Sequence, residues 1–271
     1  MYKHGTMLEV PVISPFRCPR AVLIALALIG SVASAHAEGC AFADLGEGHV
    51  AEIIDARSFR LTDGREIRLA GIEPASPEAR TAKDDSALAR LIRNQDVILQ
   101  GEDDMPDRYG RQAAFVLLAS SKALVQELLL AEGEALVSVD IADKNCAGRL
   151  LAAEAGARAA KKATWASSSA IKNAESPDDI LTGIGRFTVV EGKVLSVRQA
   201  GATTYLNFGR NWTRDFAATI PKRMMPAIES AGLSPKSLEN RRIRIRGWVE
   251  AHGGPRIEVR SPGQIELLSA N

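Results

Sequence analysis

Two short runs of alternating apolar and polar residues meet at Asp63-Gly64, and this junction limits the possible folds more than any other feature of the chain. The runs are SFRL at 58–61 and EIRLAGI at 66–72. Alternation places every second side chain on one face of a strand. Asp-Gly between two such runs favours a type I′ turn, which needs positive φ at both central positions. The sequence therefore predicts a tight antiparallel hairpin here.

Strand-like and helical segments alternate around this hairpin. Three further strands are predicted by GHVAEIID, DVILQGE and RQAAFVLL. Helices are predicted over 78–94, over 122–133 with Gly133 as the C-terminal cap, and over 145–165. Five strands interleaved with such helices indicate a small closed barrel, not a repeated β-α-β unit.

A second group of strands follows a stretch rich in Ser, Asp and Pro at 167–184, which we interpret as a linker. Five strands with a helix between the third and the fourth is the order of an OB fold, a module that often binds nucleic acids or oligosaccharides. The expected fold is therefore α+β, mainly β, with two small five-stranded OB-type barrels. The first, at 38–166, carries three helices, and the second, at 185–271, is basic.

Residues 1–37 have the features of a secretory signal peptide. Basic residues precede the apolar run AVLIALALIGSVASA, and AHA at 35–37 suits a small-residue cleavage site. The run is shorter than the roughly 20 residues of a transmembrane helix. We expect an exported protein, periplasmic or secreted, with no membrane span after cleavage.

Cleavage would leave two cysteines, Cys40 and Cys146. Two cysteines in an exported chain indicate one disulfide, because oxidising compartments favour the bond. Only two histidines, His49 and His252, would remain. This scarcity argues against a Cys/His zinc cluster and against a Ser-His-Asp triad.

The net charge of +1 conceals an uneven distribution along the chain. Residues 185–271 contain 14 Lys and Arg against 7 Asp and Glu, whereas residues 38–184 contain 17 against 25. An acidic first domain and a basic second domain are therefore expected. A polyanion such as nucleic acid would be attracted to the second one.

Four separated motifs carry a resemblance to a known family. TDGREIRLAGIE, DRYGRQAAFV, VQELLLAEGEALV and LLAAEAGARAAKKATW follow one another in the order found in the staphylococcal (thermo)nuclease family, and the similarity spans about 48–165. The resemblance implies a five-stranded OB-type barrel with three helices. It also implies hydrolysis of DNA and RNA phosphodiesters with Ca²⁺, a carboxylate general base and two arginines.

The resemblance assigns the two phosphate-binding arginines to Arg68 and Arg111. Guanidinium groups donate paired hydrogen bonds to phosphate oxygens, which accumulate charge in the transition state. Two alignments with the family are open at the position of the general base. Direct alignment places Ser76 at that position, whereas a loop longer by two residues makes Glu78 the base.

The implied Ca²⁺ site departs from the family pattern. The residual ligands would be Glu73 and Asp55, but Arg57 stands where the family has a second aspartate. Ca²⁺ requires oxygen ligands, which a guanidinium cannot supply. The sequence therefore leaves open whether the protein has nuclease activity. If the protein is an enzyme, it is a metal-dependent endonuclease or phosphodiesterase with a partly degenerate metal site.

The basic domain offers a second candidate site, in the strand RRIRIRGWVE. Alternation would place Arg242, Arg244, Arg246 and Trp248 on one exposed face, and Tyr205 on a neighbouring strand would extend it. Such a surface suits a phosphate backbone with a stacked base. It supports an alternative function, a non-catalytic envelope protein that binds nucleic acid or glycan. The oligomeric state is not indicated.

Overall fold

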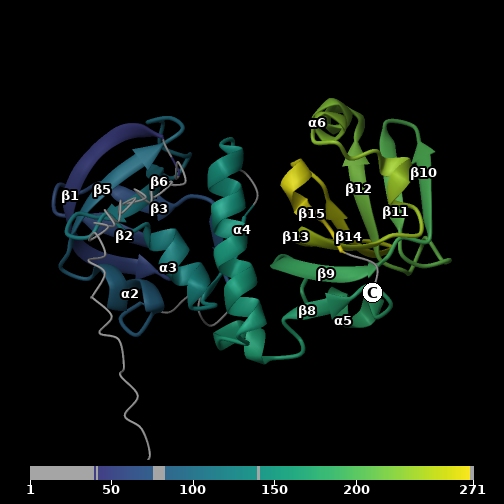
Figure 1. Ribbon diagram of the computed structural model, residues 1–271, viewed down its shortest axis with the longest axis horizontal. Helices are drawn as coiled ribbons and strands as arrows, with labels where there is room; N and C mark the ends of the chain where they lie inside the picture. The colour runs from purple at the N-terminus through teal and green to yellow at the C-terminus, as the bar shows by residue number, and fades with distance from the viewer. Residues whose placement is uncertain (1–39, 41, 76–82, 139–140, 269–271) are drawn as a thin grey trace, which may run out of the picture. The chain divides into compact units, whose positions relative to one another are not determined.

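The structure is a computed structural model, and it describes residues 40, 42–75, 83–138 and 141–268 (Figure 1). The expected signal peptide at 1–37 and the loop residues Ser76 and Glu78 lie outside these ranges. Among the described residues, no helix is long and apolar enough to cross a membrane.

The first part of the chain forms the closed five-stranded barrel that the sequence predicts. Its strands follow the order β1-β2-β3-β6-β5. Their bounds are β1 Ala43–Asp55, β2 Ser58–Leu61, β3 Glu66–Leu69, β5 Asp96–Gly101 and β6 Arg111–Leu118. A separate short pair joins β4, Ile72–Pro74, to β7, Ala135–Val137.

The predicted hairpin is confirmed, but its turn is not the two-residue one. β2 and β3 pair antiparallel, with Phe59 opposite Ile67. Of the two turn residues, only Gly64 has a positive φ, at 92°. The Leu61 amide donates to the Arg65 carbonyl, so the loop is longer than a type I′ turn. Alternation still sets the faces, because Phe59 and Ile67 are fully buried in the barrel core.

Three helices accompany the barrel, as predicted. They are α2 Ala87–Ile92, α3 Val125–Ala131 and α4 Lys144–Ala159. α2 begins at Ser86, whose hydroxyl accepts the Ala89 amide. After α3, Gly133 has a φ of 77°, and an added Cβ would lie 2.5 Å from the Lys162 carbonyl oxygen. Glycine is therefore required at the predicted cap position.

The predicted linker, 167–184, contains secondary structure. A short 3₁₀ helix, η1 Ala163–Ala166, is followed by β8 Ile171–Asn173 and α5 Pro177–Leu181. β8 pairs parallel with β9, Phe187–Lys193. The stretch interpreted as a linker is thus partly packed against the C-terminal sheet, and the domain boundaries stay a prediction.

The C-terminal part is an eight-stranded sheet whose main path is β10-β11-β12-β14-β13-β9-β8, with β15 paired to β13. The remaining strands are β10 Ser196–Ala200, β11 Thr203–Asn207, β12 Ala217–Pro221, β13 Arg242–His252, β14 Gly254–Glu258 and β15 Ile265–Leu267. Short helices η2 Lys222–Met224, α6 Met225–Ser230 and η3 Pro235–Leu238 lie between β12 and β13, and η4 Pro262–Gln264 precedes β15.

The prediction of a second closed barrel is wrong for this sheet. The helix between the third and fourth expected strands is present, as α6. However, β8 occupies one edge of β9, and no described strand pair connects β8 or β9 to β10. The sheet is therefore open over the described residues. It buries its own apolar core, which includes Leu206, Ile245 and Ile257.

Candidate functional site

Strand register brings Arg68 and Arg111 to one face of the barrel. β3 pairs parallel with β6, with Glu66 opposite Arg111 and Arg68 opposite Ala113. Residues two apart on a strand share a face, so both arginines leave the same side of neighbouring strands. Ile67, between the two β3 positions, is buried on the opposite side. The register therefore places both arginines on this barrel face.

Asp107 and Tyr109 hold the guanidinium of Arg111. Its Nε and Nη2 donate to Asp107 Oδ2 over 3.0 and 2.7 Å. The hydrogen bond from Arg111 is the main cause that lowers the pKa of Asp107, and the same bond raises the pKa of Arg111. The ion pair thus persists as pH falls until the lowered pKa of Asp107 is reached. The Arg111 guanidinium also lies 5.0 Å from the centre of the Tyr109 ring.

Arg57 binds the residues that the resemblance assigns to calcium. Its guanidinium forms an ion pair with Glu73 and donates to the Ile72 carbonyl over 3.0 Å. Its backbone amide donates to Asp55 Oδ1 over 2.8 Å. Arg68 Nη2 lies 3.9 Å from Glu73 Oε1. The Glu73 carboxylate is buried and lies beside two guanidinium groups, so it is already neutralised by protein cations.

The residues present do not fit a calcium ion. Ca²⁺ takes six to eight oxygen ligands. Here the Glu73 carboxylate contacts Arg57, and one Asp55 oxygen accepts a backbone amide. In the described ranges, no group of three His, Cys, Asp or Glu residues could hold a metal. The proposed general base, Glu78, lies outside the described residues, as does Ser76.

The expected arginine stripe on β13 is not an exposed face. Arg246 is 1% exposed and Arg244 is 9% exposed. Arg246 donates to both oxygens of Glu154 on α4, over 2.9 and 3.0 Å. Arg244 pairs with Glu191 over 2.8 Å and with Glu266 over 2.7 Å. The prediction that these two arginines face solvent is therefore wrong, because carboxylates cover that side of the strand.

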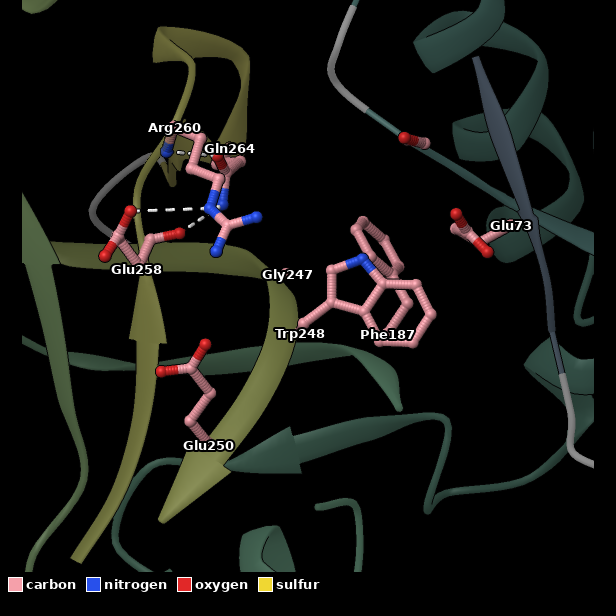
Figure 2. Close-up of a pocket in the computed structure, with 9 residues that line it drawn as sticks. Glu73, Phe187, Gly247, Trp248, Glu250, Glu258, Arg260 and Gln264 are labelled. Carbon is pink, nitrogen blue, oxygen red and sulfur yellow. Dashed lines mark hydrogen bonds and ion pairs between the residues drawn. The ribbon is translucent and has the colours of Figure 1, made fainter. Parts of the chain in front are cut away.

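The other two predicted β13 residues remain at the surface. Arg242 is exposed and pairs with Glu191 over 2.9 Å. Trp248 is 37% exposed, with its ring 6.1 Å from that of Phe187 (Figure 2). Trp248 lines a cavity of 80 Å³ whose other walls include Glu250, Glu258 and Arg260, the last paired with Glu258 over 3.4 Å. Those carboxylates disfavour a phosphate beside Trp248. A nucleic-acid role for Arg242 and Trp248 stays a prediction.

Tyr205, the fifth predicted nucleic-acid contact, lies elsewhere on the C-terminal sheet. It lines a groove together with Arg210 and Trp212. The sequence analysis did not select Arg210 or Trp212, although GRNWTR at 209–214 combines arginines with a tryptophan in a loop. Arginines beside a tryptophan in a loop are the sequence pattern that indicates such a groove.

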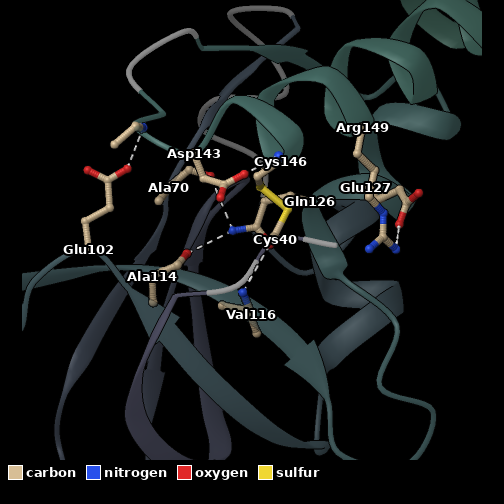
Figure 3. Close-up of a disulfide and its surroundings, with 11 residues drawn as sticks. Cys40, Ala70, Glu102, Ala114, Val116, Gln126, Glu127, Asp143, Cys146 and Arg149 are labelled. Carbon is tan, nitrogen blue, oxygen red and sulfur yellow. Dashed lines mark hydrogen bonds and ion pairs between the residues drawn. A yellow bond between two sulfur atoms is a disulfide. The ribbon is translucent and has the colours of Figure 1, made fainter. Parts of the chain in front are cut away.

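Cys40 and Cys146 lie at disulfide distance, with Cα atoms 4.3 Å apart (Figure 3).

Nearby, Gln126 is fully buried and connects α3 to the barrel. Its Nε2 donates to the Ala114 carbonyl over 2.9 Å, and its Oε1 accepts the Val116 amide over 3.1 Å. These bonds fix the middle of β6, the strand that begins at Arg111.

Comparison with known protein families finds a match over part of the chain. The model described as staphylococcal nuclease homologue matches residues 66–167, which include Arg68 and Arg111 but begin after Asp55 and Arg57. No curated protein matches the chain. This family typically depends on Ca²⁺ and acts on nucleic acid. Residues 66–167 therefore form a domain of the staphylococcal nuclease homologue family, which suggests a nuclease-like function.

Proposed function

We propose that the barrel face carrying Arg68 and Arg111 binds nucleic-acid phosphodiesters and hydrolyses them slowly, without calcium. The observation that carries this proposal is the pairing of β3 with β6, which places both arginines on one face. Two guanidinium groups on neighbouring strands can donate to the same phosphate and stabilise charge on its oxygens.

Arg57 supports the calcium-independent part of the proposal. Its guanidinium is a fixed positive charge beside Glu73, where the family resemblance expects a cation. Arg57 and Arg68 together outweigh the single charge of Glu73, so a net positive charge is left for a phosphate. A guanidinium does not, however, bind and activate a water molecule as a metal does. Proton removal from water would then depend on the proposed general base, Glu78. We therefore expect a low rate.

The same ion pair favours a second candidate function. If no group activates water, the barrel retains phosphate binding and loses hydrolysis. The protein would then be a non-catalytic envelope protein that binds nucleic acid or, through its C-terminal sheet, glycan. The first candidate function predicts a cleaved product and the second does not. Both predict a phosphate contact at Arg68.

The test is incubation of the purified protein with labelled single- and double-stranded substrates, with Ca²⁺ and with chelator. We expect equal, slow product formation in both conditions, and its loss in Arg68→Ala. Arg149→Ala is the matched control, because Arg149 is paired with Glu127 on the helices. A rate that requires Ca²⁺ would contradict the assignment of Arg57. Binding without product, weakened in Arg68→Ala, would support the second candidate.

We also propose export, to the periplasm or outside the cell. The signal-like sequence at 1–37 supports it, and so do the two cysteines, Cys40 and Cys146, that cleavage would leave. Protein purified from the exported fraction should contain a peptide pair joined through these cysteines, which separates after reduction. Mass spectrometry of non-reduced and reduced digests measures this, and two free thiols in exported protein would contradict it.

A further inference from the structure

A groove on the C-terminal sheet gathers basic and aromatic side chains away from the barrel face. It has a volume of 650 Å³ and lies over β10, β11, β12 and β14, beside the loop that follows β11. The residues that matter for its chemistry are Arg198, Tyr205, Asn207, Arg210, Trp212 and Arg256.

Strand register places the sheet residues of the groove on one face. Arg198 lies opposite Tyr205, and Asn207 lies opposite Ala217, which in turn lies opposite Arg256. The intervening residues, such as Leu206 and Ile257, are fully buried in the core on the other side. The groove is therefore the outer face of the sheet, held by the packing beneath it.

The charge of the groove is positive. Arg198, Arg210 and Arg256 line it, and none of its lining residues is an aspartate or a glutamate. One carboxylate of the loop after β11, Asp215, accepts the Asn211 amide over 2.8 Å and so serves the loop itself. The cavity beside Trp248 differs in this respect, because Glu250 and Glu258 line it. The groove is thus complementary to a polyanion.

Two aromatic rings give the groove flat surfaces. Trp212 is 77% exposed, although an indole ring is large and apolar. Tyr205 is partly buried, and the Arg256 guanidinium lies 5.5 Å from its ring centre. Exposed aromatic rings beside arginines are the elements of a single-strand binding surface, where bases stack on rings and phosphates contact cations.

We infer that this groove binds single-stranded nucleic acid, with bases stacked on Trp212 and Tyr205 and phosphates held by Arg198 and Arg210. A duplex keeps its bases stacked on one another and cannot use the rings in this way. A neutral glycan would not require three arginines without a carboxylate. The inference goes beyond the proposed function, because binding here needs neither Arg68 nor hydrolysis.

The test uses the full chain and a fluorescein-labelled oligothymidine, whose length is checked by gel electrophoresis after each measurement so that binding is measured apart from cleavage. Fluorescence anisotropy at low salt should show binding, and Trp212→Ala should weaken it roughly 5- to 150-fold, as for loss of one stacked base. Arg210→Ala should reduce the slope of log K against log salt by about 0.7, as for loss of one phosphate contact.

Arg223→Ala is the matched control, since Arg223 is an exposed arginine of the same part that pairs with Glu258 and does not line the groove. It should bind as the wild type does. Equal affinities of Trp212→Ala, Arg210→Ala and wild type would overturn the inference, as would tighter binding of a sulfated glycan than of the oligonucleotide. Arg68→Ala should retain binding in the groove. The binding measurement therefore tests the groove even if the barrel does not hydrolyse nucleic acid.

Discussion

Replacement of Glu154 by alanine is expected to lower the free energy of unfolding by about 3–5 kcal/mol. The Glu154 carboxylate is fully buried and accepts hydrogen bonds from both Nη atoms of Arg246 and from the Val137 amide. Without it, the buried Arg246 guanidinium keeps a hydrogen bond to the Val137 carbonyl, at 3.4 Å, and, among the described residues, one distant carboxylate, Glu266, at 3.5 Å. An uncompensated buried charge is among the most destabilising outcomes of a single substitution.

Urea denaturation of the variant and the wild type measures this effect. Glu127→Ala is the matched control: Glu127 also pairs with an arginine, Arg149, but both side chains are partly exposed. Loss of such a surface pair should cost about 0–1 kcal/mol. If Glu154→Ala unfolds like Glu127→Ala, the buried pair does not form in solution.

A double variant separates the charge from the packing. Glu154→Leu combined with Arg246→Met removes both ions and retains apolar volume. Replacement of a whole buried ion pair by apolar residues is often neutral or stabilising. The double variant should therefore be more stable than Glu154→Ala alone. A double variant as unstable as the single one would show that the cost arises from packing and not from an unpaired charge.

The barrel was predictable because local patterns and global packing agree there. Alternation around Asp63-Gly64 determined which residues of β2 and β3 enter the core, and Gly133 marked the end of α3. The open C-terminal sheet was not predictable from strand order. Its state depends on β8, from a stretch rich in Ser and Pro, occupying an edge of β9, and no local pattern encodes that contact.

The site residues show the same division. Arg68 and Arg111 were assigned through the resemblance to the nuclease family, and the parallel register of β3 and β6 then places both on one face. The burial of Arg244 and Arg246 could not be foreseen, because alternation assigns two faces without saying what covers each one. Their partners Glu154 and Glu266 lie far away in the chain, at sequence separations of 92 for Arg246 and Glu154 and 22 for Arg244 and Glu266.

Substitution of Arg57 by aspartate is expected to create calcium binding at the barrel face. Arg57 contacts Glu73 and, through its amide, Asp55. Arg57→Asp removes the guanidinium from Glu73 and adds a carboxylate near two others, so three acidic side chains can supply oxygen ligands. Without a cation these carboxylates repel one another, and the variant should be less stable than the wild type in chelator.

Thermal unfolding with and without Ca²⁺ tests this independently of activity. At a calcium concentration 100 times the dissociation constant, a bound ion stabilises the folded state by about 2.7 kcal/mol. For a chain of this size, that corresponds to a rise in Tm of roughly 5–10 °C. Calcium should also increase the rate of phosphodiester hydrolysis in this variant, because a metal can activate water where a guanidinium cannot.

Two control variants isolate the added ligand from the change of charge. Arg57→Ala releases Glu73 without adding an oxygen, and it should respond weakly to calcium. Arg90→Asp changes the net charge by the same amount at an exposed position of α2, and its Tm should be unaffected by calcium. Calcium could instead shift the Tm of Arg57→Asp no more than that of Arg90→Asp. That outcome would show that Arg57 does not exclude calcium from this face, and that the positions of Asp55 and Glu73 prevent binding.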